Sequence, residues 1–460
     1  MAGIGLRLRQ LFQQESYFSI VTGYFYSIVI ATGPWLFSVI ALAGLGAFSR
    51  SWLAVPDLYL FRVVIIYSFA FSLVLIGPCQ LVFTRYLADL LYADRASELS
   101  PAVAGMLLLT LWLAFPVAAT FYLFSPYSFL FKVTGTVLFV AICGIWVCMI
   151  FLEVLRDFAS VLRGFFLCSL LSVLLAALLG RRWGIEGQLG GFTIGMVCLL
   201  LFMVFRAFRE FGLPSGDLWR FLEAFRAHRT LVALGAVYNL GVWVDKMLYW
   251  VLPGGLHVGY LFYDHYPYDT AVFLAYLLAV PSLGYFLMAV ETGFYERYRD
   301  FFGGVTRKRA LVTLEHLRDN ILGTLKAGAA NLLQIQGLVT ILALALAPLL
   351  MAKIMPDPLL LTCFRLATLA VFFHVLLLLS IIILMYFEFY RQALTAASIF
   401  LAANTACTTV AIFLLPGAPA AGYLAASAAA TAVSLAYSRR LLKDLLPQTF
   451  LRQPVLQDKG

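Results

Sequence analysis

The stretch that decides the fold class is residues 131–152, FKVTGTVLFVAICGIWVCMIFL, in which Lys132 carries the only charge. At a rise of about 1.5 Å per residue, a helix of this length is about 33 Å long. The hydrocarbon core of a bilayer is about 30 Å thick. The stretch therefore predicts a transmembrane helix.

Similar apolar stretches recur along the whole chain. Of its 460 residues, 63% are hydrophobic and 12% are charged, whereas soluble domains have about 45–50% and about 25%. This composition excludes a water-soluble fold and predicts an all-α membrane protein with about twelve transmembrane helices. The predicted helices cover Phe18–Ala47, Tyr59–Phe83, Val103–Phe124, Phe131–Leu152, Phe158–Leu179, Gly187–Phe205, Thr230–Leu252, Thr270–Val290, Gly328–Met351, Leu361–Phe387, Gln392–Leu414 and Ala420–Tyr437.

Arginine and lysine are distributed unevenly between the two sides of this topology. The segments on the side of the N-terminus contain 23 of them, and the opposite segments contain four, Arg50, Arg181, Arg182 and Lys353. Because cytoplasmic loops are enriched in these residues, we expect both termini in the cytoplasm. The net charge of +9 then reflects topology rather than nucleic-acid binding.

The basic loop after the sixth predicted helix divides the chain into halves with the same starting side, as a parallel repeat requires. We therefore expect two six-helix bundles around a central cavity. The predicted parts are a cytoplasmic amphipathic N-terminus (1–17), an N-terminal lobe (18–212), a basic linker (213–229), a C-terminal lobe (230–437) that includes a cytoplasmic helical loop (291–326), and a cytoplasmic tail (438–460).

Sequence signatures of catalysis are missing. The chain has no G-x-x-x-x-G-K-[ST], H-E-x-x-H or G-x-S-x-G motif, and its seven cysteines fall in predicted spans without metal-ligand spacing. We expect no enzymatic activity, cofactor or metal. The predicted exterior loop 253–269 gathers His257, Asp264, His265 and Asp269. A polar or metal-binding mouth is one interpretation, but the absence of ligand spacing favours an ordinary exposed loop.

Asp245 and Lys246 lie inside the seventh predicted helix. Ionisable residues in a span cost roughly 2.5–3.5 kcal/mol each at the membrane centre and often mark function. Because neighbours on a helix point about 100° apart, we expect each to need a partner other than the other. We hypothesise that Asp245 makes an inter-helix contact and that Lys246 and Trp243 line the cavity. In the alternative, Lys246 reaches the interface with its long stem.

Other residues complete the predicted site. The candidates for the substrate path that share this helix face or lie near the outer helix ends are Asn239, Tyr249, Trp250, Arg62 and Arg365. Glycine and proline inside spans predict helix kinks, which either face a cavity or only serve the packing of neighbouring helices. The candidates for such kinks are Gly33, Pro34, Gly77, Pro78 and Pro281.

The loop 291–326 is too polar to span the membrane, but its apolar residues recur at helical spacing. These are Leu311, Leu314, Leu317, Ile321 and Leu325. The spacing predicts an amphipathic helix that lies on the inner membrane surface, contacts a cytoplasmic partner or packs on its own protein. The candidates for partner contact are Glu291, Tyr295, Glu296, Arg307, Lys308 and Arg309.

Several blocks, spread in order along nearly the whole chain, resemble the PelG family of inner-membrane exopolysaccharide transporters. They are MAGIGLRLRQLF (1–12), ATGPWL (31–36), and residues 61–92, 238–250, 280–303 and 364–389. The polar residues within these blocks, such as Thr84-Arg85-Tyr86 and Asp245-Lys246, make the resemblance specific. The resemblance implies the fold of the multidrug/oligosaccharidyl-lipid/polysaccharide exporter superfamily and a location in the bacterial inner membrane.

The resemblance also implies a cargo and partners: an N-acetylgalactosamine-rich Pel-like polymer, a PelF-like glycosyltransferase, and PelD- and PelE-like membrane proteins. Polysaccharide export is the function that we favour. A flippase for lipid-linked oligosaccharide or a small-molecule antiporter on the same scaffold is the alternative. A membrane glycosyl- or acyltransferase is disfavoured, because the sequence lacks an acidic or histidine constellation at one membrane depth.

The predicted topology can be tested with reporter fusions. A reporter at Gly216 or within residues 305–318 should report cytoplasm, and one within residues 254–269 should report the periplasm, because the cation asymmetry is large. Paired alkaline phosphatase and green fluorescent protein fusions measure this. Reversal at either place would contradict the orientation.

Overall fold

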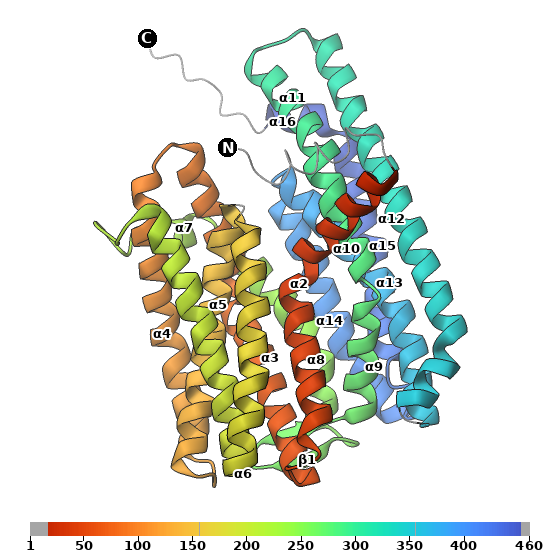
Figure 1. The fold of residues 1–460 in the computed structure, drawn as a ribbon. Coiled ribbons are helices and arrows are strands. Elements are labelled where there is room, and N and C mark those ends of the chain that lie inside the picture. Colours follow the sequence, from red (N-terminus) through yellow and green to blue (C-terminus); the bar gives the residue numbers. More distant parts are fainter. Residues whose placement is uncertain (1–16, 156, 355, 452–460) are drawn as a thin grey trace. The chain divides into compact units, whose positions relative to one another are not determined.

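The computed structural model of the protein describes residues 17–155, 157–354 and 356–451, which are almost entirely helical (Figure 1). Residues 1–16 of the predicted N-terminal segment and residues 452–460 of the predicted tail lie outside the described residues. The elements are α2 (Tyr17–Ser49), α3 (Val55–Tyr92), η1 (Ala96–Glu98), α4 (Leu99–Leu123), α5 (Phe129–Val154), α6 (Phe158–Phe211), α7 (Leu222–Ala227), α8 (Arg229–Val251), β1 (Leu256–Gly259), β2 (Phe262–Asp264), α9 (Tyr266–Leu277), α10 (Val280–Ala289), the π-helical turn η2 (Val290–Phe294), α11 (Tyr295–Thr306), α12 (Leu311–Ile354), α13 (Pro358–Tyr386), α14 (Tyr390–Leu414), α15 (Ala421–Lys443) and α16 (Leu445–Leu451).

All twelve predicted helices have counterparts. Within the described residues, nine candidate spans are long and apolar enough to cross a membrane. One of them, α6, has 54 residues and non-helical backbone at Trp183 and Gly184, so it covers two predicted helices. Two further helices, α2 and α15, match the first and last predicted ones. The predicted all-α membrane fold is confirmed.

The predicted amphipathic helix in residues 291–326 is not a separate element. Its second half is the start of α12, a continuous helix of 44 residues. Part of the apolar stripe is covered by protein: Leu314 and Ile321 are buried, whereas Leu311 is 59% exposed, and an added Cβ on Gly304 of α11 would lie 3.0 Å from Leu317. This packing supports the interpretation in which the helix packs on its own protein, and a location on the membrane surface stays a prediction.

The proline candidates behave differently from one another. Pro281 stands in the first turn of α10, after the interruption that separates α10 from α9. Pro78 lies inside α3, which remains one helix. Gly33 and Pro34 lie within the helical backbone of α2, and the side chain of Pro34 is outside the described part.

The helices group into two compact units. Of the described residues, those within 32–269 and 397–422 form unit 2, and those within 17–31, 270–396 and 423–451 form unit 1. In unit 2, α5 packs beside α4, α6 and α3, and α3 packs beside α8 (Figure 1). A Cβ added to Gly235 of α8 would lie 2.1 Å from the carbonyl oxygen of Gly77, so these backbones touch. The predicted lobes, 18–212 and 230–437, stay a prediction.

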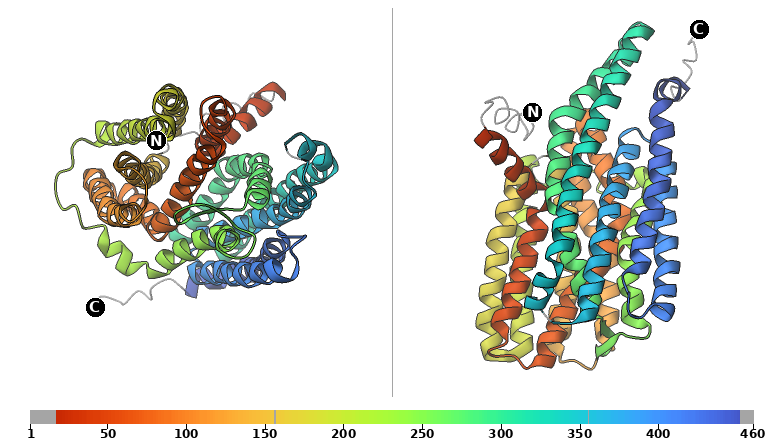
Figure 2. Two further views of the ribbon diagram at one scale, coloured as in Figure 1. Left: turned by 90° about the horizontal axis from the view of Figure 1, so that it is seen from below. Right: turned by 90° about the vertical axis from the view of Figure 1, so that its right-hand side faces the viewer.

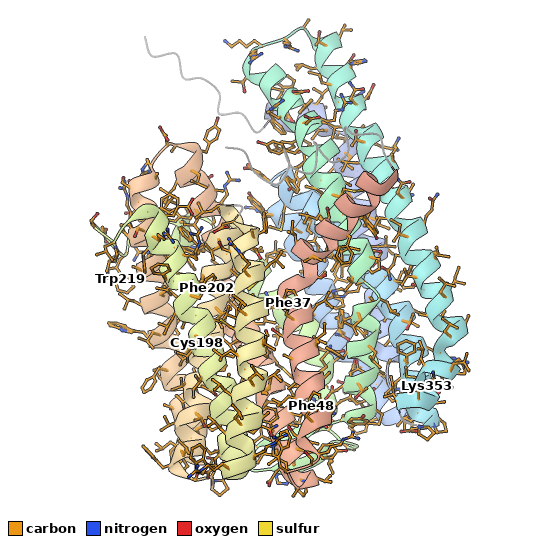
Figure 3. All side chains as sticks on the ribbon, in the orientation of Figure 1. Phe37, Phe48, Cys198, Phe202, Trp219 and Lys353 are labelled. Carbon is orange, nitrogen blue, oxygen red and sulfur yellow. The ribbon has the colours of Figure 1, made fainter. Side chains whose placement is uncertain are left out.

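Polar contacts tie the helices of unit 1 together. Ser282 Oγ donates to Gln336 Oε1 at 2.7 Å, joining α10 to α12. Tyr24 Oη donates to the carbonyl of Pro281 at 2.8 Å, joining α2 to α10. In the same unit, α11 and the first turns of α12 form a hairpin that projects beyond the neighbouring helices (Figure 2). We call it the α11–α12 hairpin, and Lys353 lies near the opposite end of α12 (Figure 3).

Candidate functional site

Asp245 and Lys246 are buried in unit 2, with 0% and 7% exposed. The Lys246 ammonium lies 3.1 Å from both carboxylate oxygens of Asp245 and donates to the carbonyl of Val242 at 3.0 Å. The expectation that these neighbours cannot neutralise each other was wrong. The long lysine stem bends back one turn along α8, so its charge reaches the adjacent carboxylate and does not extend to an interface.

Asp245 has a second partner on another helix. Tyr268 Oη of α9 donates to its carboxylate at 2.6 Å, which is an inter-helix contact of the kind predicted for Asp245. Lys246 also lies over the ring of Trp243, at 5.6 Å from its centroid. The geometry thus brings Asp245, Lys246, Trp243 and Tyr268 together, and the predicted roles in the cavity stay a prediction.

The two aromatic candidates near the end of α8 act as anchors. Tyr249 Oη donates to the carbonyl of Pro419 at 2.5 Å. Trp250 Nε1 donates to Asp269 at 2.8 Å, and its ring stacks on Tyr67 of α3 with 4.5 Å between centroids. Because both side chains are buried, neither presents an open face for sugar stacking in this conformation.

Arg62 of α3 binds a residue about 200 positions away in the chain. Its Nη2 lies 2.6 Å from Asp264 Oδ2, and the Asp264 side chain is 1% exposed. The guanidinium also lies 4.7 Å from the ring centroid of Tyr266. Removal of Arg62 would leave the buried Asp264 carboxylate uncompensated, which strongly destabilises a protein.

The predicted exposed loop 253–269 contains a β-hairpin whose first strand begins exposed and whose second strand is packed. Strands β1 and β2 pair antiparallel with an irregularity between His257 and Gly259. Phe262 of β2 is 1% exposed and packs against Tyr67, Phe121 and Tyr127, with ring centroids 5.3–6.3 Å apart. We call this element the β-hairpin. The β-hairpin lies at the same end of unit 2 as Phe48, which is near the end of α2 (Figure 3).

The metal interpretation of this loop gains no support. Within the described residues, no group of three His, Cys, Asp or Glu side chains is placed to hold a metal ion. Burial lowers the pKa of His265 below its usual value, which favours the neutral imidazole. Its Nδ1 accepts a hydrogen bond from the backbone N–H of Tyr268 at 3.3 Å.

The remaining path candidates do not join this cluster through any contact described here. Asn239 donates to the carbonyl of Gly235 at 2.9 Å, at the close contact of α8 with α3. Arg365 belongs to unit 1 and is exposed on α13. An open groove of about 660 Å³ between α8 and α14 is lined by none of the candidates; its lining is Val237, Ser398, Leu401, Ala402, Thr405, Ala406, Thr409 and Val410.

Comparison with known proteins identifies the family. The model of the PelG family, described as "Putative exopolysaccharide Exporter (EPS-E)", matches residues 1–450. The chain belongs to the PelG family. Its apolar helices and its family make it a multi-pass membrane protein, and neither family nor fold indicates a catalytic activity. A search of curated proteins found no match.

Solved structures show the same fold at low sequence identity. An outward-facing multidrug resistance MATE family transporter of the MOP superfamily is 13% identical, with a TM-score of 0.62 over 91% of this chain and 96% of that one. MATE in the bent conformation is 13% identical, with a TM-score of 0.61 over 93% and 97%. A MOP superfamily transporter from Pyrococcus furiosus is 13% identical, with a TM-score of 0.57 over 91% and 96%. The PelG-family chain therefore has a MATE-like fold.

The partner-contact candidates lie on the α11–α12 hairpin or just before it. Arg307, Lys308 and Arg309 form its turn, and all three are exposed. Tyr295 and Glu296 begin α11. The side chain of Glu291 lies outside the described part of the structure.

The pairing of Asp245 with Lys246 predicts a strong energetic coupling. Asp245→Asn and Lys246→Met should each lower the unfolding temperature, because each leaves one buried group of the pair uncompensated, at a typical cost of about 3–5 kcal/mol. The double variant should lose less than the sum of the two. Thermal unfolding of the purified protein in detergent measures this, and additive losses would contradict the pairing.

Proposed function

We propose that this protein exports a Pel-like, N-acetylgalactosamine-rich biofilm exopolysaccharide from a cytoplasmic synthase across the bacterial inner membrane. The observation that carries the proposal is the match of an exopolysaccharide-exporter family over residues 1–450. The MATE-like fold supports a transport role, because two-bundle transporters expose a site between their bundles alternately to each side.

A small-molecule antiporter is the second candidate, because the similar structures include a multidrug resistance transporter. A flippase for lipid-linked oligosaccharide is a third. Its pyrophosphate cargo would need available cations, whereas Arg62 and Lys246 are each neutralised by a carboxylate. This pairing favours an uncharged or weakly charged glycan over a pyrophosphate-linked one.

Secretion from the native host tests the proposed cargo. Deletion of the gene should abolish the secreted polymer without changing drug susceptibility. Asp245→Asn and Lys246→Met should each reduce secretion at matched membrane abundance, because they disturb the link between α8 and α9. Lys353→Met, at an exposed helix end, is the matched control and should secrete normally. Quantified secreted amino sugar is the measurement.

Two results would count against this function. Normal secretion after deletion would exclude polymer export, and a simultaneous gain in drug susceptibility would favour the antiporter. Normal secretion from both site variants would remove Asp245 and Lys246 from the mechanism without affecting the cargo assignment.

We also propose that the α11–α12 hairpin binds the cytoplasmic glycosyltransferase, alongside PelD- and PelE-like membrane partners. At about 1.5 Å per residue, residues 311–327 extend about 25 Å beyond the predicted start of the span at Gly328. Electrostatic attraction is screened over about 8 Å at physiological ionic strength, so the cations of the turn are too distant to attract lipid headgroups. Leu311 and Val312, exposed by 59% and 76%, add an apolar contact next to these cations.

Charge reversal in this turn tests the partner proposal. The combined change Arg307→Glu, Lys308→Asp and Arg309→Glu should reduce co-purification of the glycosyltransferase, because an acidic partner surface would be repelled. Aspartate is chosen for position 308 because Lys308 has a φ of 51°, which Asp tolerates better than most residues. Reversal of Arg439, Arg440 and Lys443, three exposed cations at the end of α15, is the matched control. Equal co-purification from both triple variants would contradict the proposal.

A further inference from the structure

The β-hairpin is held to α3 by a partly buried ion pair beside a second carboxyl group. Arg62 Nη2 and Asp264 Oδ2 are 2.6 Å apart. Asp269, in the first turn of α9, lies beside Asp264: its Oδ2 is 3.5 Å from the backbone nitrogen of His265, the residue that follows Asp264. Trp250 Nε1 of α8 donates to Asp269 Oδ2 at 2.8 Å. The two carboxyl groups therefore meet where α3, α8, α9 and the β-hairpin converge in unit 2.

One oxygen of Asp269 lacks a hydrogen-bond donor. Its Oδ1 is buried, and no described residue donates to it, whereas Oδ2 accepts from Trp250 and, at 3.5 Å, from the backbone N–H of His265. An ionised carboxylate only accepts hydrogen bonds, and a protonated one also donates. Two adjacent carboxyl groups can therefore hydrogen-bond to each other only when one of them holds a proton.

The charges around the pair lead to the same requirement. Arg62 supplies one positive charge, which balances one carboxylate. His265 is favoured as the neutral form, because burial lowers its pKa. The more distant Lys246 is paired with Asp245 on α8. A second buried negative charge would thus remain uncompensated, which is costly in a medium of low dielectric constant.

The tyrosines that face the pair do not supply the missing charge. Tyr67 of α3 accepts a hydrogen bond from the backbone N–H of Tyr263 in β2 at 3.0 Å. Tyr59 and Tyr266 flank the Arg62 guanidinium with their rings. A tyrosine side chain brings no positive charge, so a proton on the pair is the simplest way to balance Arg62.

We propose that Asp264 and Asp269 form a proton-binding site, and that the shared proton holds the β-hairpin on α9, next to Arg62 of α3. With the proton, the pair carries one net negative charge, which Arg62 balances. Without it, two buried carboxylates repel each other, and separation of the β-hairpin from α9 relieves the repulsion. The attached state is therefore favoured while the proton is bound, and it is lost as the pH rises enough to remove the proton. The site does not depend on the identity of the cargo.

Full-length protein in lipid nanodiscs provides the test, with two readouts over a pH series. Infrared difference spectroscopy detects the carbonyl stretch of a protonated carboxylic acid. Hydrogen exchange of residues 256–264, corrected for the intrinsic pH dependence of exchange, reports release of the β-hairpin. In the unmodified protein, the carboxylic-acid band should disappear with rising pH, and exchange of the β-hairpin should accelerate over the same range.

Two variants should lose the same band but affect the β-hairpin in opposite ways. Asp269→Asn replaces the shared proton with an amide N–H, so the β-hairpin should stay protected at every pH. Asp264→Asn removes the partner of Arg62, so the β-hairpin should exchange rapidly at every pH. Because each variant is informative without the other, failure of one to fold leaves the proposal testable.

Controls define the results that would overturn the proposal. Asp57→Asn changes a carboxyl group in the first turn of α3, and His265→Asn removes the nearby imidazole while keeping an acceptor for Tyr268. Both should behave as the unmodified protein does. Loss of the pH dependence in His265→Asn, persistence of the band in both Asp264→Asn and Asp269→Asn, or a response to sodium concentration at constant pH would each refute a proton shared by the two carboxyl groups.

Discussion

Lipid cannot form hydrogen bonds with a peptide group, and the rest of this structure depends on that constraint. Every backbone group in the membrane needs a partner within the protein, so the described spans are helices. Between helices the hydrophobic effect contributes little, and close packing and interhelical hydrogen bonds take its place. The contact of Gly77 with Gly235 provides the first, and the hydrogen bond from Asn404 Nδ2 to the carbonyl of Gly241 at 3.0 Å provides the second.

The same lack of water governs the charged groups of unit 2. Asp245 is neutralised by Lys246 and hydrogen-bonded by Tyr268, and Arg62 is paired with Asp264. An unpaired charge at these positions would carry a desolvation cost of several kcal/mol. The pairs also connect elements that are distant in the chain, since α3, α8, α9 and the β-hairpin all contribute a member. The groups that are most costly to bury thus become the links of this unit.

Helix length has a different consequence in unit 1. A helix of 44 residues is about 66 Å long, roughly twice the thickness of the hydrocarbon core. The excess of α12 must therefore extend into water. Its apolar stripe would be unfavourable there without a cover, and α11 covers Leu314 and Leu317 of the stripe at Gly304. The α11–α12 hairpin is thus a small helical pair of its own, with its cations at the turn.

The sequence by itself determined the class of fold, the number of membrane helices and most of their bounds, because the length of an apolar run responds directly to the thickness of the bilayer. It also marked Asp245 and Lys246, since charge in a span is rare. Only the tertiary structure decided their partners. The pairing of Arg62 with Asp264, and the packing of the predicted exposed loop as a β-hairpin, depend on residues about 200 positions apart, and no local periodicity encodes which distant side chains meet. The sequence also did not show that the Lys246 side chain bends back to Asp245, because rotamers in a protein interior are set by the surrounding packing.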